Sequence, residues 1–406
     1  MYGNMENKTA APKNIMAKIY TIAGFLIALS IGLVCVSNII HDRMKFRDEA
    51  VRNVETTWGK AQTIGVGELE YKEKDKKDIN TYTYDSTVTT TKANAKVELK
   101  KKGIYEVPVY SVKINQKGEF KINPAPKGTK AEFKFKVSDP RGFISKPVVK
   151  FNNIIANDCS SYKCNVILDG EIKIPYEIEY SIRGTKSLTF DAVGTSETYL
   201  STNYWVPEYT GDFSPVEHKQ VKDGYYTYWA VPEAASAVED KYRTLNYTTN
   251  FINTVDVYRM TERCVKYGFL FIALTFLAFF VYEIINKNNK HIHPFQYSLI
   301  GVSMLVFYLL LLSISEFIDF SYAYLTAAIM TIGLISFYTY FVLTNKEDKK
   351  FPLAIGGILG VIYLYLYITI NLEELSLLAG SFGLFFAIIA VMYATRNVEW
   401  YKENQQ

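Results

Sequence analysis

Apolar residues gather in six runs along the chain, each of about the length that crosses a bilayer. One run, Ile19–Ile40, lies near the start, and five follow in the last third. These five cover residues 267–285, 295–315, 320–343, 351–370 and 375–395. An α-helix needs about 20 residues to cross the ~30 Å hydrocarbon core. The pattern therefore predicts a membrane protein with an α-helical bundle of six transmembrane helices, one N-terminal and five C-terminal.

Charged residues between the runs predict the orientation of the chain. Basic residues flank the runs in four segments, and they are Lys8, Lys13, Lys18, Lys287, Lys290, Lys346, Lys349, Lys350, Arg396 and Lys402. The two remaining short loops are acidic, with Glu316 and Asp319 in one and Glu373 and Glu374 in the other. Because cytoplasmic loops are rich in Lys and Arg, both termini are expected in the cytoplasm. The long polar segment is then expected outside it.

The first apolar run is interpreted as an uncleaved signal anchor rather than a signal peptide. It exceeds the usual 7–15-residue core, and no A-x-A-like cleavage site follows it. A lipoprotein site would need a small residue before Cys35, where Val34 stands. The expected division is a cytoplasmic N-terminus 1–18, an anchor 19–40, an extracytoplasmic β-rich domain 41–266, a five-helix bundle 267–395 and a cytoplasmic tail 396–406.

The polar segment begins with a helical pattern and then changes to strands. Apolar residues recur at helical spacing over residues 42–62, and Gly65-Val66-Gly67 is expected to break that helix. From about Leu69 onward, alternation with a period of two predicts strands at Thr83–Val97, Tyr105–Ile114, Ala131–Val137, Ile172–Ile182 and Lys186–Ala192.

Turn signals separate these strands. They are Gln116-Lys117-Gly118, Asp139-Pro140-Arg141-Gly142, Leu168-Asp169-Gly170, Arg183-Gly184 and Lys222-Asp223-Gly224. Short strands at this spacing predict a large, mainly antiparallel β domain, built as one sandwich or as two packed sheets. A domain of this length can bury a sizeable core.

Two of the four cysteines fall inside this β domain, whereas Cys35 lies in the first apolar run and Cys264 at the boundary with the second. Cys159 and Cys164 bracket four residues, and an oxidising envelope would permit a disulfide between them. Two reduced thiols are the alternative. A metal site is not expected, because the histidines of this domain are distant in sequence.

Known catalytic motifs are absent from the sequence. It contains no G-x-S-x-G, P-loop, H-E-x-x-H or C-x-x-C pattern. No catalytic residue, cofactor or nucleic-acid partner is therefore expected. Ionisable residues are missing from the centres of the apolar runs, which disfavours an ion pathway. Glu283, Glu316 and Asp319 lie near the ends of runs and are interpreted as side chains that snorkel to water.

Small and aromatic residues mark the fifth apolar run. Gly356 and Gly360 form a small-xxx-small pattern, which predicts close helix packing. Tyr363, Tyr365 and Tyr367 follow. Tyrosines favour the membrane interface, so they are interpreted either as an interfacial belt or as the aromatic wall of a groove.

Several segments, spread in order over nearly the whole chain, resemble the signatures of one family. They are Trp58–Thr63 with its W-G-x-x-Q, Gly103–Tyr110, Ser138–Gly142, Phe213-Ser214-Pro215, Gly224–Trp229, Val255–Gly268 and His293–Tyr297. Together they resemble the CreD family of bacterial inner-membrane proteins. After W-G-x-x-Q the family tends to continue with G-P, whereas Gly67-Glu68 stands here. The resemblance implies a role in envelope integrity, colicin tolerance and a stress response, with no established catalytic residues.

The leading hypothesis is a non-enzymatic protein of the bacterial inner membrane that supports envelope integrity. Its partners would be the lipid bilayer and an envelope protein or cell-wall component, bound or sensed by the β domain. One alternative is a transporter or lipid-handling protein that uses the C-terminal helices. Another is an envelope enzyme. The sequence does not predict the oligomeric state.

Overall fold

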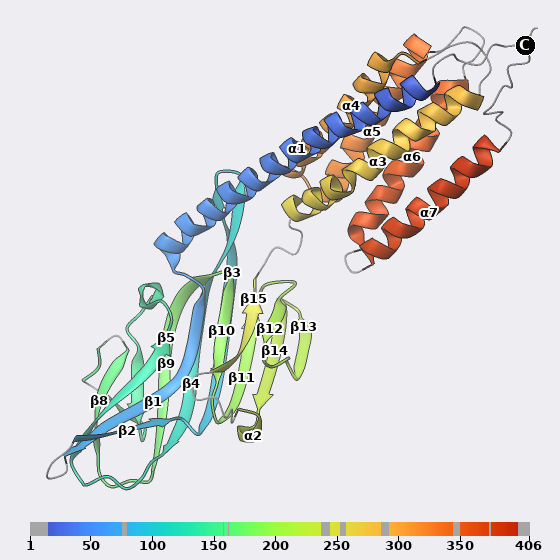
Figure 1. Ribbon diagram of the computed structural model, residues 1–406. Helices are drawn as coiled ribbons and strands as arrows, with labels where there is room; N and C mark the ends of the chain where they lie inside the picture. Colours follow the sequence, from blue (N-terminus) through green and yellow to red (C-terminus); the bar gives the residue numbers. More distant parts are fainter. Residues whose placement is uncertain are drawn as a thin grey trace, which may run out of the picture. The chain divides into compact units, whose positions relative to one another are not determined.

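The computed structural model describes residues 15–74, 79–156, 158–160, 162–236, 244–251, 257–285, 292–343, 350–372 and 375–396. The chain divides into two compact units. The helix unit comprises Met1–Phe46 and Val255–Gln406, and the β unit comprises Arg47–Thr254. Figure 1 labels the elements of both.

Long apolar helices make up the helix unit, as predicted. Its helices are α1 Ile15–Trp58, which continues past Phe46 into the β unit, α3 Val257–Ile285, α4 Pro294–Ser315, α5 Phe320–Leu343, α6 Lys350–Asn371 and α7 Ser376–Thr395. Within the described residues, five are long and apolar enough to cross a membrane, namely α1, α3, α4, α5 and α6. The described apolar part of α7, Leu378–Tyr393, is shorter. The helical membrane architecture is confirmed, with five such helices rather than six.

Glycines lie beneath leucine side chains where α1 packs on α3 and α4. A Cβ atom on Gly268 of α3 would lie 2.7 Å from the Leu33 side chain of α1. Gly32 of α1 and Gly301 of α4 are likewise covered, by Leu305 and Leu29 of the facing helix. Since lipid tails are as apolar as leucine, close packing of this kind is a main source of helix association in membranes.

Helix α1 ends at Trp58, four residues earlier than predicted. Gly59 has φ +126, a conformation that only glycine adopts readily. Strand β1 then starts at Gln62 and continues through Gly65 and Gly67, with an irregularity between Ile64 and Gly67. The expectation that Gly65-Val66-Gly67 breaks a helix is therefore wrong. A Cβ on Gly67 would lie 2.7 Å from the Tyr176 ring, so this glycine makes room for an aromatic side chain.

Two sheets form the β unit. The strands are β1 Gln62–Lys74, β2 Ile79–Asp85, β3 Val88–Lys102, β4 Tyr105–Lys121, β5 Thr129–Val137, β6 Val148–Phe151, β7 Ile154–Ile155, β8 Lys163–Leu168, β9 Lys173–Thr185, β10 Ser187–Ala192, β11 Thr195–Thr202, β12 Glu208–Gly211, β13 Glu217–Val221, β14 Gly224–Val231 and β15 Leu245–Asn250. A 3-10 turn, Pro140–Gly142, and the short helix α2, Glu233–Ser236, complete the unit.

One sheet has the order β12-β15-β10-β1-β5-β8, with β2 also on β1, and the other has β13-β14-β11-β3-β4-β9-β6-β7. Among the described strands, β1 with β10 and β11 with β3 are the parallel pairs, and the rest are antiparallel. The prediction of a mainly antiparallel domain is confirmed. One core joins the sheets, with the Phe133 ring of β5 lying 5.2 Å from that of Tyr176 in β9.

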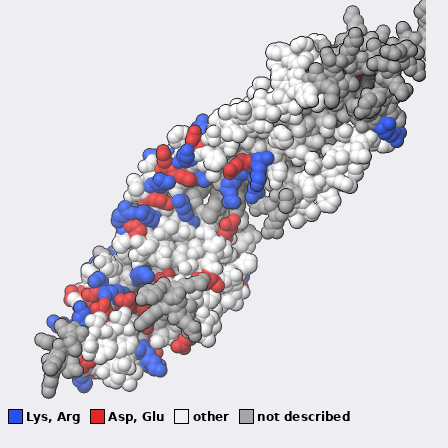
Figure 2. Space-filling model, in the orientation of Figure 1, with Lys and Arg blue, Asp and Glu red and all other residues white. Residues whose placement is uncertain are grey.

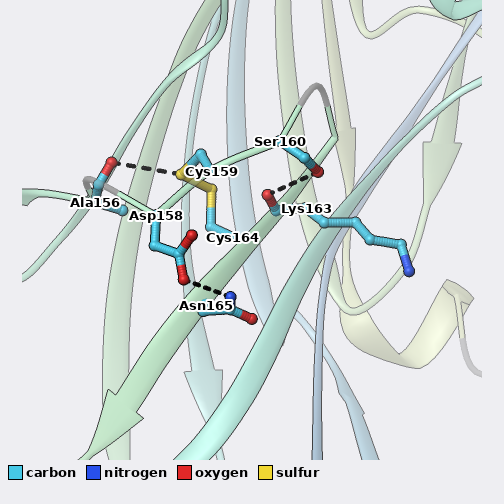
Figure 3. Close-up of a disulfide and its surroundings, with 7 residues drawn as sticks. All are labelled: Ala156, Asp158, Cys159, Ser160, Lys163, Cys164 and Asn165. Carbon is cyan, nitrogen blue, oxygen red and sulfur yellow. Dashed lines mark hydrogen bonds between the residues drawn. A yellow bond between two sulfur atoms is a disulfide. The ribbon is translucent and has the colours of Figure 1, made fainter.

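Two of the crossings between the sheets join edge strands. Strands β7 and β8 are edge strands of different sheets and follow one another in sequence, and so do β12 and β13. A disulfide between Cys159 and Cys164 lies in the first crossing (Figure 3). In the same crossing, the Asn165 side chain donates a hydrogen bond to the Asp158 carboxylate. Each of these two crossings joins an edge strand of one sheet to an edge strand of the other.

Two predicted turns are wrong for a common reason. Gln116-Lys117-Gly118 lies inside β4, and Arg183-Gly184 lies inside β9. Each glycine is the cross-strand partner of a tyrosine, Gly118 of Tyr176 and Gly184 of Tyr110, and the ring covers the glycine. An aromatic ring over a cross-strand glycine compensates for the missing side chain.

The turns at Gly170 and Gly224 are confirmed, since both glycines have positive φ, Gly170 between β8 and β9 and Gly224 at the start of β14. The predicted strand Thr83–Val97 is divided in two between β2 and β3.

Candidate functional site

Motifs that are distant in the sequence meet at the end of α1. The Gln62 side chain donates hydrogen bonds to the carbonyl oxygens of Asp139, at 3.1 Å, and Arg183, at 2.9 Å. Its own oxygen accepts from the Asp139 backbone N–H at 3.2 Å. Gln62 is fully buried. A buried amide with its partners in place thus joins β1, β9 and the 3-10 turn.

The Asp139 carboxylate organises that turn. It accepts hydrogen bonds from the Arg141 side chain, at 2.8 Å for both Nε and Nη2, and from the Lys60 backbone N–H at 3.1 Å. These bonds, first those from Arg141, lower the pKa of Asp139 to about 2. Gly142 must be small, because a Cβ there would lie 2.7 Å from the Gln62 amide nitrogen.

Trp58 packs the last turn of α1 against the sheet that contains β3, β4 and β9. Lys100 Nζ lies 3.5 Å and the Arg183 guanidinium 4.4 Å from the indole, both within range of cation–π attraction. The indole N–H also donates to the Tyr110 carbonyl oxygen at 3.3 Å. The charged and polar groups of this cluster bind one another. The cluster therefore anchors the end of α1 and is not a site for a ligand.

A surface of a different kind lies on β11 and β14. Tyr199 and Tyr228 are cross-strand partners whose rings stack at 4.8 Å. Both hydroxyls donate to the Glu197 carboxylate, at 3.2 and 3.4 Å. Tyr226 lies two residues away on the same face of β14, with Lys219 Nζ 5.2 Å from its ring.

We call Tyr199, Tyr226, Tyr228, Glu197 and Lys219 the tyrosine surface. Its three rings are half-buried, whereas their neighbour Trp229 points the other way into the core. The surface therefore combines flat aromatic faces with a carboxylate and an ammonium group.

The first turns of α3 carry a second concentration of polar groups. Arg259, Glu262, Arg263 and Lys266 follow one another at i, i+3, i+4 and i+7, which places them on one face of the helix. With Ser37 and Val265 they line a pocket of about 440 Å³, here called the α3 pocket.

Two carboxylates near the helix ends are buried and paired. Glu316 has a side chain that is 7% exposed and lies 3.7 Å from Arg43 Nε. It accepts a hydrogen bond from the Tyr258 hydroxyl at 3.1 Å. Glu283 is 9% exposed and pairs with Lys18. The interpretation that these two side chains snorkel to water is therefore wrong. Asp319, by contrast, is exposed.

The tyrosines singled out in α6 take part in helix packing. The Tyr363 ring is buried and lies 4.8 Å from the Phe307 ring of α4. The Tyr365 hydroxyl donates to the Ala379 carbonyl oxygen of α7, and the Tyr367 hydroxyl donates to Ser321 Oγ of α5 at 3.0 Å. Each tyrosine thus joins α6 to a different helix.

The glycines singled out in α6 differ from one another. A Cβ on Gly356 would lie 2.9 Å from Ser336 Oγ of α5, which agrees with close packing there. A Cβ on Gly360 would meet no described atom within 4 Å. The close approach in this part of the bundle therefore lies at Gly356.

Neither the tyrosine surface nor the α3 pocket was identified from the sequence. The pocket has a readable signal, because R-x-x-x-R-x-x-K directly precedes an apolar run. The tyrosine surface has a weaker one, because aromatic residues occupy both faces of Gly224–Trp229. Over the described part of the chain, no three His, Cys, Asp or Glu side chains are grouped so that they could hold a metal ion.

Comparison with known proteins decides the family. The sequence model of the family described as "Inner membrane protein CreD" matches residues 14–401. This chain belongs to the CreD family. It is similar to the protein named "Inner membrane protein CreD" of Escherichia coli (strain K12), at 27% identity over 95% of this chain and 93% of that protein. With its apolar helices, this CreD family member is a multi-pass protein of the inner membrane.

Proposed function

We propose that this CreD family member is a non-enzymatic protein that supports the integrity of the cell envelope. In this proposal the β unit lies outside the cytoplasm and binds a glycan of the cell wall through the tyrosine surface. The observation that carries the binding role is the stacked pair Tyr199 and Tyr228 with a shared carboxylate on an outward face.

The chemistry of the tyrosine surface matches that of a sugar polymer. Tyrosine supplies rigid, amphipathic contact area at a low cost in conformational entropy. Pyranose rings have apolar C–H faces, which stack on aromatic rings, and hydroxyl groups at their edges, which bind carboxylates such as Glu197. Trp229 and Tyr247 already fill the core behind this face, so the outward rings are not needed for it.

A binding experiment with the full-length protein in detergent tests this proposal. Purified cell-wall sacculi should sediment the protein, and Tyr226→Ala with Tyr228→Ala should weaken sedimentation at least about tenfold, since aromatic contacts of this kind are often worth ~2 kcal/mol. Tyr162→Ala is the matched control, because Tyr162 is 45% exposed and directly precedes β8, an edge strand of the other sheet. Equal binding by all three proteins would refute the role of the tyrosine surface.

The proposed orientation of the protein in the membrane has its own test. Basic residues at the cytoplasmic ends of the predicted spans support cytoplasmic termini. A reporter that is active only in the cytoplasm should therefore work when fused after Gln406 and fail when inserted after Asp169, in the turn between β8 and β9. The reverse pattern would place the β unit in the cytoplasm and end the wall-binding proposal.

A further inference from the structure

Lysines on the outer face of the sheet that contains β3, β4 and β9 have carboxylate partners. The pairs, with separations between 2.6 and 3.6 Å, are Lys96 with Glu98, Lys113 with Glu179, Lys117 with Glu177 and Lys150 with Glu177. Lys92 of β3 lies on the same face and is exposed, yet among the residues that the structure describes it has no such partner. The series of ion pairs on this face is therefore interrupted at Lys92.

The strand register explains why no carboxylate lies beside Lys92. Its partners on the neighbouring strands are Tyr199 of β11 and Asn115 of β4. Asn115 donates a hydrogen bond to Glu177 at 3.0 Å. Side chains that interact across strands are those directly opposite one another. Lys92 is therefore flanked by an aromatic ring and an amide instead of a glutamate.

The acidic residues nearest to Lys92 on this face bind other groups. Glu197 lies opposite Thr90 in the register and accepts hydrogen bonds from two tyrosine hydroxyls of the tyrosine surface. On the other side of β3, Glu179 pairs with Lys113 at 2.6 Å. Neither carboxylate is thus matched to the Lys92 ammonium group.

Lys92 borders the tyrosine surface directly. Neighbouring strands lie ~4.8 Å apart, and the register pairs Lys92 with Tyr199, whose ring stacks on that of Tyr228. Lysine carries a compact charge with several hydrogen-bond donors on a flexible stem. A sugar ring stacked on the two tyrosines would therefore hold its substituents within reach of this ammonium group.

We propose that Lys92 determines which glycan the tyrosine surface binds, by pairing with a carboxylate on the sugar or on a peptide attached to it. This inference rests on the proposed binding of a cell-wall glycan and adds the class of ligand, an anionic glycan rather than a neutral one. The preference for a carboxylate follows from the site, since one exposed ammonium group supplies a single point charge. Glu197 remains the acceptor for sugar hydroxyls.

Three soluble probes test this inference with the full-length protein in detergent, by isothermal titration calorimetry. They are a neutral chitin oligosaccharide, wall glycan chains freed of peptides and wall glycan chains that keep their peptides. The natural protein should bind at least one wall-derived probe roughly fivefold more tightly than the chitin oligosaccharide, the upper size of one exposed ion pair. Lys92→Gln should abolish this preference and leave the affinity for the chitin oligosaccharide unchanged, which also shows that the variant is folded.

Two further variants control for charge. Lys96→Gln makes the same charge change on the same face of β3, at a lysine whose ammonium lies 3.1 Å from Glu98. It should leave the preference intact. Lys92→Arg keeps the positive charge and should retain most of the preference. Because the site is exposed, high salt should reduce the preference of the natural protein.

Each outcome has a definite meaning. Loss of preference for the peptide-free chains in Lys92→Gln assigns the carboxylate to the sugar, and loss confined to the peptide-bearing chains assigns it to the peptide. Equal binding of all three probes by the natural protein, or an equal loss with Lys96→Gln, overturns the role of Lys92 and leaves glycan binding standing. A preference that survives in Lys92→Gln does the same. Binding of none of the probes overturns both proposals.

Discussion

The helix unit and the β unit differ in the burial and pairing of their charged side chains. In the helix unit, the Glu283 and Glu316 side chains are 9% and 7% exposed, and each is paired with a cation from α1. In the β unit, Lys113 and Glu179 pair at 2.6 Å across neighbouring strands while remaining 67% and 45% exposed. Figure 2 shows charged side chains spread over the β unit, whereas the visible face of the helices is white over most of its length.

The difference follows from the solvent that each unit meets. Water surrounds the outer faces of both sheets, so Lys and Glu can alternate there at little cost, and each pair contributes little. Lipid cannot solvate an ion, so a carboxylate in a membrane helix needs a partner inside the protein. In the helix unit, a charged side chain therefore makes a specific contact between helices. In the β unit, a charged side chain mainly faces water.

The strongest test of this comparison removes one partner of a buried pair. Glu283→Leu leaves Lys18 beside the buried Tyr297 without its carboxylate. We expect the free energy of unfolding to fall by about 2–3 kcal/mol, because an unpaired charge remains inside the protein. Unfolding of the full-length protein by SDS titration in mixed micelles measures it.

The matched double variant sharpens that test. Lys18→Met together with Glu283→Leu removes both charges, and it should recover most of the lost stability. If the double variant is as unstable as Glu283→Leu, the unpaired charge is not what lowers the free energy of unfolding. The comparison between the two units is then wrong for this site.

A smaller effect is expected at Asp139 of the β unit, whose carboxylate accepts hydrogen bonds from Arg141 and Lys60. Its pKa of about 2 lies below the ordinary 3.8, so its ionised form stabilises the fold fully above 3.8, and this stabilisation is lost as pH falls through about 2. Asp139→Asn should lower stability at pH 6 by about 1–2 kcal/mol, after allowance for solvent screening of the exposed Arg141.

Tryptophan fluorescence during urea unfolding of the full-length protein, repeated from pH 6 down to pH 2, follows this effect. The difference between the natural protein and Asp139→Asn should shrink toward pH 2. A difference that stays constant with pH would mean that the turn depends on the shape of the side chain and not on its charge.

The smallest effect is expected on the outer face of the second sheet. Lys113→Ala removes an exposed cross-strand pair and should change the free energy of unfolding by less than about 1 kcal/mol. The same urea titration, at low and at high salt, provides the measurement. A loss as large as that of Glu283→Leu would remove the distinction between the two units.

Much of the architecture could be predicted from the sequence, because the signals that carry it are local. A run of about 20 apolar residues crosses a bilayer whatever its neighbours are, and alternation with a period of two marks a strand with one buried face. The turns at Gly170 and Gly224 were predictable for the same reason, since each joins strands that are close in sequence.

Only the tertiary structure decided which local signals were misleading and which residues form sites. Gly118 and Gly184 resemble turn residues, yet both lie in strands beneath tyrosines from a neighbouring strand. Glu283 and Glu316 resemble residues at a water interface, yet cations of α1 reach them inside the helix unit. In each case the deciding partner is distant in the sequence. The sequence by itself determined where the long apolar helices lie and where several of the strands lie, because bilayer thickness and strand periodicity act on neighbouring residues. The paired carboxylates, the tyrosine surface and the α3 pocket arise from contacts that exist only once the chain has folded.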